Sequence, residues 1–188
     1  MGIFNFFKEK LNKKKPTDDF DTCLLRVFKI LSHGDNEVIE KIRACMSDTR
    51  GYFEEHENDF DERGMEYSPE AEKWIKFIAA VDALECAGYA AELDHKAETE
   101  DFAAALEDVL DASGIEFSLK NIEFAPEKSI PDCAAQFNEY AGQSGITVMF
   151  IDIDSDCYVM CAAQIADYAE AAEIASRIGV YISCREEK

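Results

Sequence analysis

Long apolar runs are missing from this sequence of 188 residues. A helix that spans a membrane needs roughly 18 to 20 consecutive apolar residues, and no stretch approaches that length. A secretory signal is also not expected, because signal peptides place basic residues before the apolar run. Here Ile3, Phe4, Phe6 and Phe7 come first and the lysines follow. We therefore expect a cytoplasmic protein without a transmembrane segment.

The cysteines lack the spacing of a disulfide framework. Seven of them are spread over the chain, and no two form a C-x-x-C pair. An odd number without regular spacing is typical of reduced thiols, and a buried reduced cysteine acts as a small apolar residue. The content of 47% apolar residues is sufficient for a core without cross-links.

Familiar catalytic motifs are absent as well. The sequence has no G-x-S-x-G, G-x-x-x-x-G-K-S/T, G-x-G-x-x-G or H-E-x-x-H. Its three histidines, His33, His56 and His95, do not have the spacing of metal ligands. A nucleophilic cysteine with a distant histidine stays open, but nothing marks one cysteine as activated. We assign no catalytic residue, expect no cofactor, and favour a protein that is not an enzyme.

Positive charge is scarce, and the formal net charge is −21. Residues 1–15 run against this trend, with five lysines and one glutamate, so the rest of the chain is more acidic still. An acidic body repels phosphate backbones, because nucleic-acid affinity depends on lysine and arginine displacing counterions. We expect no nucleic-acid partner. The charge favours a basic protein partner, or it serves only to keep the protein soluble.

Residues 1–15 form a basic amphipathic arm that ends before Pro16. Phe4, Phe7 and Leu11 lie on or beside its apolar stripe, and the lysines lie mostly outside it. Such an arm can dock on an anionic membrane surface or on a partner. The alternative is that its phenylalanines pack on the body of the same protein.

The remaining pattern predicts an α+β fold. We expect a small, mainly antiparallel sheet with a hairpin in the C-terminal half, packed by several helices and preceded by an N-terminal helical hairpin. The hairpin and an acidic connector occupy residues 16–66, and the α+β part occupies 67–188. Predicted helices cover 18–31, 36–46, 68–86, 99–112, 129–143 and 163–178; predicted strands cover 89–94, 146–153, 157–161 and 180–182, with one or two more within 115–125.

Two local signals support these helix starts. Asn36 is a plausible N-cap of the second helix, because asparagine side chains accept hydrogen bonds from the first turn. Ser68-Pro69-Glu70 combines a capping serine, a proline suited to the first helical position and an acidic first turn.

Asp152, Asp154 and Asp156 form the most suggestive cluster. On a continuous strand, their two-residue spacing would put all three carboxylates on the face of Val148 and Phe150. Clustered carboxylate oxygens suit a divalent cation, with Asp152 and Asp154 as the first candidate ligands. The alternative is a polar hairpin tip, since aspartate and serine are favoured turn residues.

Asp82 is a carboxylate on the apolar face of a predicted helix. A charge in that position requires a hydrogen-bond or ion-pair partner, because burying it alone is costly. Asp94 and His95 follow a predicted strand and could join the hairpin aspartates in an acid–base or metal site. Capping or salt bridging explains each of these residues separately.

Several short motifs resemble a known family. They are W-I-x-x-I at Trp74, A-E-L-D-H-K at Ala91, D-F-x-x-A-L at Asp101 and I-D-I-D-S-D-C-Y-V at Ile151. The segment of about residues 68–185 is similar to a bacterial family catalogued as domain of unknown function 6630. The resemblance implies a bacterial cytoplasmic protein and no particular chemistry. Antitoxin and immunity proteins of similar size and acidity offer an analogy only.

We therefore expect an interaction module that presents an acidic surface to a protein partner. Two alternatives remain open. One is a divalent-metal-dependent hydrolase that uses the hairpin aspartates, and the other is a peripheral membrane protein held by the N-terminal arm.

Overall fold

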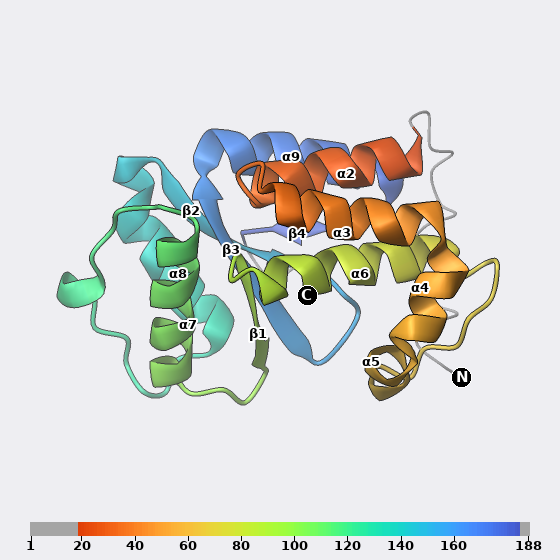
Figure 1. Cartoon of the computed structure of the whole chain (residues 1–188). Helices are drawn as coiled ribbons and strands as arrows, with labels where there is room; N and C mark the ends of the chain where they lie inside the picture. Colours follow the sequence, from red (N-terminus) through yellow and green to blue (C-terminus); the bar gives the residue numbers. More distant parts are fainter. Residues whose placement is uncertain (1–18, 185–188) are drawn as a thin grey trace.

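The computed structural model describes residues 19–184, and helices dominate this part of the chain (Figure 1). Each long helix buries an apolar side, as for α2 with Phe20, Leu24 and Leu31. The helices are α2 (Phe20–Leu31), α3 (Asn36–Ser47), α4 (Thr49–Glu55), α5 (Glu57–Glu62), α6 (Glu72–Cys86), α7 (Thr99–Ala112), α8 (Ile130–Ala141) and α9 (Ile165–Ile178), with short 3-10 turns at η1 (Leu119–Asn121) and η2 (Gly142–Ser144).

The strands of the described residues form one antiparallel sheet in the order β1-β3-β2-β4. They are β1 (Ala90–Asp94), β2 (Ile146–Ile151), β3 (Cys157–Gln164) and β4 (Ile182–Ser183). β2 and β3 are the predicted hairpin, in which Ile151 lies opposite Val159. β1 and the very short β4 occupy the two edges.

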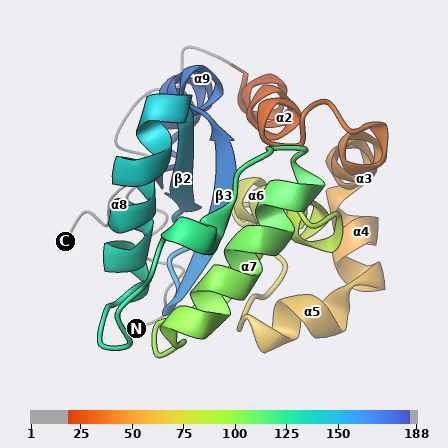
Figure 2. The ribbon, with the colours of Figure 1, turned by 90° about the vertical axis from the view of Figure 1, so that its left-hand side faces the viewer.

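Helices cover both faces of this sheet (Figures 1 and 2). Successive residues of a strand point to opposite faces. Val159 and Cys161 of β3 enter the core made with α2, α3, α6 and α9, whereas Met160 and Ala162 enter the core made with α7 and α8. The predicted α+β class, with its antiparallel sheet and its N-terminal helical hairpin, is confirmed.

The N-terminal helices share a core with the rest of the protein. α2 packs along α9, and α3 packs along α6. Buried residues of 16–66, such as Phe28 and Ile42, belong to the same cluster as Ile78 and Ile174 from 67–188. The two predicted segments are therefore not two separately packed bodies within residues 19–184.

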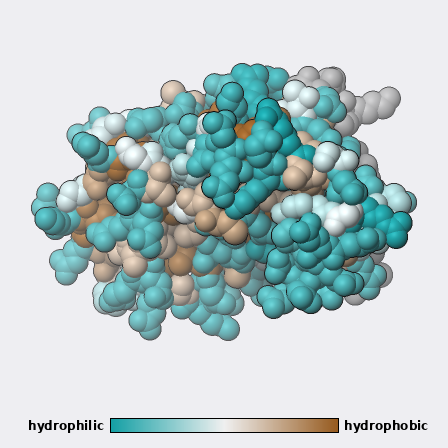
Figure 3. Space-filling view, in the orientation of Figure 1, coloured by the Kyte–Doolittle hydropathy of each residue, from teal (hydrophilic) through white to brown (hydrophobic). Residues whose placement is uncertain are grey.

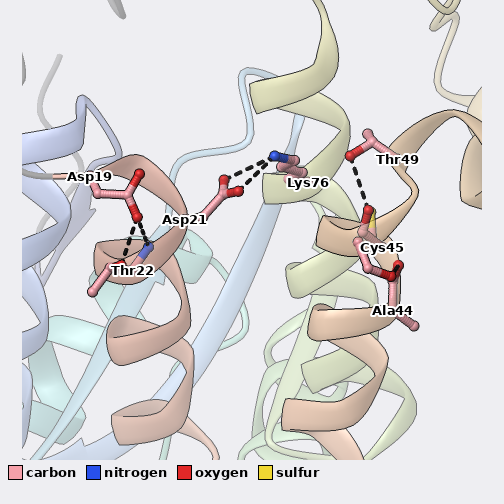
Figure 4. Close-up of polar contacts among 8 residues, drawn as sticks. Asp19, Asp21, Thr22, Ala44, Cys45, Thr49 and Lys76 are labelled. Carbon is pink, nitrogen blue, oxygen red and sulfur yellow. Dashed lines mark hydrogen bonds and ion pairs between the residues drawn. The ribbon is translucent and has the colours of Figure 1, made fainter.

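Polar contacts at the N-terminal end of α2 cap this helix and link it to α6 (Figure 4). Asp19 caps it by accepting hydrogen bonds from the backbone and hydroxyl of Thr22, at 3.0 and 2.6 Å. Lys76 of α6 donates to both carboxylate oxygens of Asp21, at 3.0 and 2.8 Å. Because the lysine side chain is only 14% exposed, this pair links α2 to α6 where water is partly excluded.

Asn138 of α8 completes the hydrogen bonding of β2. β4 pairs with β2 only at Phe150 and Ile151, so it does not reach Val148. Instead, the Asn138 amide accepts from Val148 N at 2.7 Å and donates to Val148 O at 2.9 Å. The side chain thus takes the place of a strand neighbour at a buried residue.

α3 begins at Asn36 as predicted, but its cap lies one residue earlier, and α6 begins four residues later than predicted. α3 is capped by Asp35 and not by Asn36, because the Asp35 carboxylate accepts from the backbone of Glu37 and Val38. Ser68 does accept a hydrogen bond, from Ala71 N at 3.2 Å, but it caps a separate turn. The helix begins only at Glu72.

The strand predicted within residues 115–125 is also wrong. This segment contains the turn η1 and no strand. Ile115 and Leu119 are buried and Phe117 between them is half-buried, so burial does alternate as in a strand, but the segment pairs with no strand within residues 19–184. Ile115 and Leu119 pack into the core beneath α7 and α8.

None of the helices within residues 19–184 has the length and apolar character needed to cross a membrane. The predicted arm of residues 1–15, with Phe4, Phe7 and Leu11, lies outside the described residues.

Candidate functional site

Four charged side chains meet at the junction of α5, α6 and β1, and we call them the Arg63 cluster: Arg63, Asp82, Glu85 and Glu92. Nη2 of Arg63 lies 3.0 Å from Asp82 Oδ1 and 3.0 Å from Glu92 Oε2. The same nitrogen is 3.8 Å from Glu85 Oε2. One guanidinium is therefore shared by three carboxylates.

Local structure explains why these residues converge. Arg63 caps the C-terminal end of α5, and Gly64 after it turns the chain with a φ of 66°. Asp82 and Glu85 are one turn apart on α6 and so share a side of that helix. Glu92 follows Ala90 by two residues on β1, so it points to the face of the sheet that α6 covers.

Burial and mutual repulsion change the titration of the cluster. Desolvation, followed by the charges of Glu92 and Asp82, raises the pKa of Glu85 from 4.5 to about 7, despite the opposing effect of Arg63. Desolvation likewise raises the pKa of Asp82, although Arg63 opposes it. Desolvation acts to lower the pKa of Arg63, but Asp82 and Glu92 outweigh it and raise that pKa.

Glu85 is the least satisfied member of the cluster. Its Oε1 is buried and accepts no hydrogen bond from the described part of the protein. Its Oε2 is beyond hydrogen-bond distance of Arg63. Buried polar atoms nearly always have partners, so this carboxylate has unused capacity to bind a cation or to hold a proton.

Cys157 and Cys161 lie on β3 beside the cluster, and because they are four residues apart they point to the same face of the sheet. Desolvation and a hydrogen bond with Glu92 raise the pKa of the Cys157 thiol. Desolvation also raises the pKa of Cys161, which is buried in the core. A raised pKa keeps both thiols protonated and therefore weakly nucleophilic.

Asp82 is thus the one predicted site residue that belongs to the Arg63 cluster. Asp94 ends β1 and accepts a hydrogen bond from Lys96 N at 2.7 Å, which closes an exposed turn. His95 Nδ1 is 3.5 Å from Asp94 Oδ1 in that turn. Asp94 lies opposite Cys157 in the sheet, next to the loop that carries the three aspartates.

The three hairpin aspartates do not continue a strand. β2 ends at Ile151, and Asp152 Oδ1 accepts a hydrogen bond from Asp154 N at 2.9 Å. Asp154 has a φ of 55°, a left-handed conformation that breaks the two-residue alternation before Asp156. The expected common face for the carboxylates is therefore wrong. Among residues 19–184, no three histidine, cysteine, aspartate or glutamate side chains are grouped so that they could hold a metal ion.

Sequence reasoning missed Arg63, Glu85 and Glu92. Signals for two of them were present. Arg63 is the only lysine or arginine between Arg50 and Lys73, within a strongly acidic stretch. Glu85 follows Asp82 by three residues, so any partner that approached Asp82 would also meet it.

Comparison with known proteins adds a family and no activity. A family model described as Domain of unknown function (DUF6630) matches residues 23–185. The match therefore extends well before residue 68 and includes nearly all of the N-terminal helical hairpin. Neither the curated proteins nor the solved structures contain a match to this chain.

Proposed function

This chain belongs to the family described as Domain of unknown function (DUF6630), and since that description assigns no activity, we propose a function from the geometry. The protein is an interaction module that presents an acidic surface to a basic protein partner. It acts by binding and not by catalysis. The observation that carries the proposal is the Arg63 cluster, in which one cation serves three carboxylates.

The surface next to this cluster supports the proposal. Residues 54–66, on α4, α5 and the chain that follows, expose seven carboxylates, which we call the acidic face. They are Glu54, Glu55, Glu57, Asp59, Asp61, Glu62 and Glu66. The single arginine within this stretch, Arg63, already contacts Asp82 and Glu92. The acidic face therefore joins a cluster that itself has more negative than positive groups.

Such a surface attracts cations more strongly than isolated carboxylates would. Charges of one sign add their potentials, raise the local concentration of an oppositely charged partner and speed its association. The partly buried carboxylates contribute more per charge than exposed ones, because the surrounding protein screens them less than water does. Lysine and arginine side chains of a protein are the matching chemistry.

The test is binding of a fluorescein-labelled decapeptide of arginine to the full chain, measured by anisotropy at several salt concentrations. The variant Glu55→Lys/Asp61→Lys/Glu62→Lys reverses three charges of the acidic face. All three positions are exposed and lie at the C-terminal ends of α4 and α5, where cations suit the helix dipole. We expect binding to weaken roughly tenfold or more, since three attractive contacts become repulsive.

A matched variant separates a local surface from net charge. Glu116→Lys/Glu123→Lys/Glu127→Lys makes the same change in charge at exposed positions around η1, far from α5 (Figure 1). It should retain most of the affinity. Equal weakening in both variants would mean that the peptide responds only to total charge, and the proposal would then fail.

A further inference from the structure

The outer edge of β1 offers backbone groups for pairing. β1 lies at the end of the sheet order, and among residues 19–184 its only strand neighbour is β3. Residues of an antiparallel edge strand alternate between pointing their N–H and C=O groups inward and outward. An open edge of this kind can accept an extended segment from another chain.

Glu92 shows where this edge is open. The residue as a whole is exposed, yet its side chain, which reaches inward to Arg63, is only 28% exposed. Much of the exposure therefore belongs to the backbone of Glu92. The carboxylate beneath that exposed backbone belongs to the Arg63 cluster.

The side chains along this edge specify the character of an added strand. On the face that α6 covers, a new strand beside Glu92 would place alternate side chains near the Arg63 cluster, where a basic group is favoured. On the opposite face its neighbours would include Leu93, which belongs to the apolar core of α7 and α8. Figure 3 shows less hydrophilic surface over the region of β1 and α7, next to the hydrophilic surface of α4 and α5.

A second copy of this chain does not fit the same edge. Glu92 is the central residue of β1, so antiparallel pairing of two β1 strands about their centre would place Glu92 opposite Glu92. Like charges directly opposite each other in a sheet are destabilising. The charge of this edge thus disfavours self-pairing and favours a basic strand.

We propose that the partner binds as an extended segment with alternating basic and apolar residues, which adds to the sheet at the outer edge of β1. This inference rests on the proposed function, because it describes how a basic partner is held. The backbone of β1 supplies hydrogen bonds, Glu92 and Glu85 receive a basic side chain, and the acidic face accelerates the encounter.

Two peptides of equal length and charge test the geometry. One is a decapeptide of alternating arginine and valine, and the other is the same peptide with a methyl group on every backbone nitrogen, which removes the N–H donors that a sheet needs. We expect the arginine–valine peptide to bind the full chain about tenfold more tightly or better, because two or three added backbone hydrogen bonds are lost in the other. Hydrogen exchange should show new amide protection in residues 90–94, with β4 at the opposite edge as the internal control.

The outcomes separate this inference from the function on which it rests. Equal affinities, or new protection that leaves residues 90–94 unchanged, would overturn edge pairing while basic peptides still bound. If neither peptide bound the protein at low salt, the acidic interaction surface itself would be refuted.

Discussion

Replacement of Glu85 by glutamine tests the electrostatic description of the Arg63 cluster directly. Glutamine has the shape of a protonated glutamate and cannot ionise. The Glu85 side chain is 21% exposed, so desolvation acts strongly on its charged form. Glu85→Gln should therefore behave like the low-pH form of the wild type at every pH.

The sign and size of the effect follow from linkage. Some carboxyl groups have a higher pKa in the folded state than in the unfolded state. Such a group stabilises the fold at pH values below its unfolded-state pKa, and this stabilisation is lost as the pH rises through its folded-state pKa. For Glu85 the window runs from 4.5 to about 7. Each pKa unit corresponds to about 1.36 kcal/mol, so the free energy of unfolding of the wild type should fall by on the order of 3 kcal/mol across this window. That of Glu85→Gln should not fall in this way.

Urea unfolding followed by circular dichroism at several pH values between about 4 and 8 measures this difference. We expect the two proteins to be nearly equal in stability at the acid end and the variant to be the more stable at pH 8. Glu55→Gln makes the same chemical change at an exposed position of α4 and should show little pH-dependent difference. A difference between Glu85→Gln and wild type that stays constant with pH, or that favours wild type at pH 8, would refute the reasoning.

Three further outcomes can be checked with the same methods. Arg63→Met leaves three partly buried carboxylates without their cation and should lower the free energy of unfolding by roughly 1–3 kcal/mol, with less effect at low pH, where the carboxylates are protonated. Asn138→Ala removes both hydrogen bonds to the buried Val148 backbone and should cost roughly 2–3 kcal/mol, and Asn138→Asp should not restore the stability, because its second carboxylate oxygen would face the Val148 carbonyl oxygen. Calorimetric titration with Mg²⁺, Mn²⁺ or Ca²⁺ should show no stoichiometric site that depends on Asp152 and Asp154; tight binding that Asp152→Asn/Asp154→Asn abolishes would restore the metal hypothesis.

Local patterns predicted the helices and strands where the period was clear. The predicted helix 99–112 has the bounds of α7, and the strand predicted for 89–94 differs from β1 by one residue. In these segments the apolar residues follow a single helical or strand period, and a residue that ends the element comes next, such as Gly114 after α7. The prediction for 115–125 was wrong because its alternating apolar residues, such as Ile115 and Leu119, are buried against the core of α7 and α8 without pairing with a strand of residues 19–184.

Site prediction depended on contacts that no local pattern contains. The sequence indicated that Asp82 needs a partner, since it interrupts an apolar helix face. It did not identify Arg63, which is 19 residues earlier, or Glu92, which is on a different element. In the hairpin, the spacing of the aspartates suggested one carboxylate face, but the left-handed conformation of Asp154 redirected the chain.

The sequence by itself thus determined the acidic character, the fold class and most of the elements, because these depend on composition and on periods within a few residues. The tertiary structure alone decided which carboxylates share Arg63, how far the proton affinity of Glu85 rises and which strand has an open edge. Those properties depend on desolvation and on distances between elements, and both arise only when α5, α6 and β1 pack together.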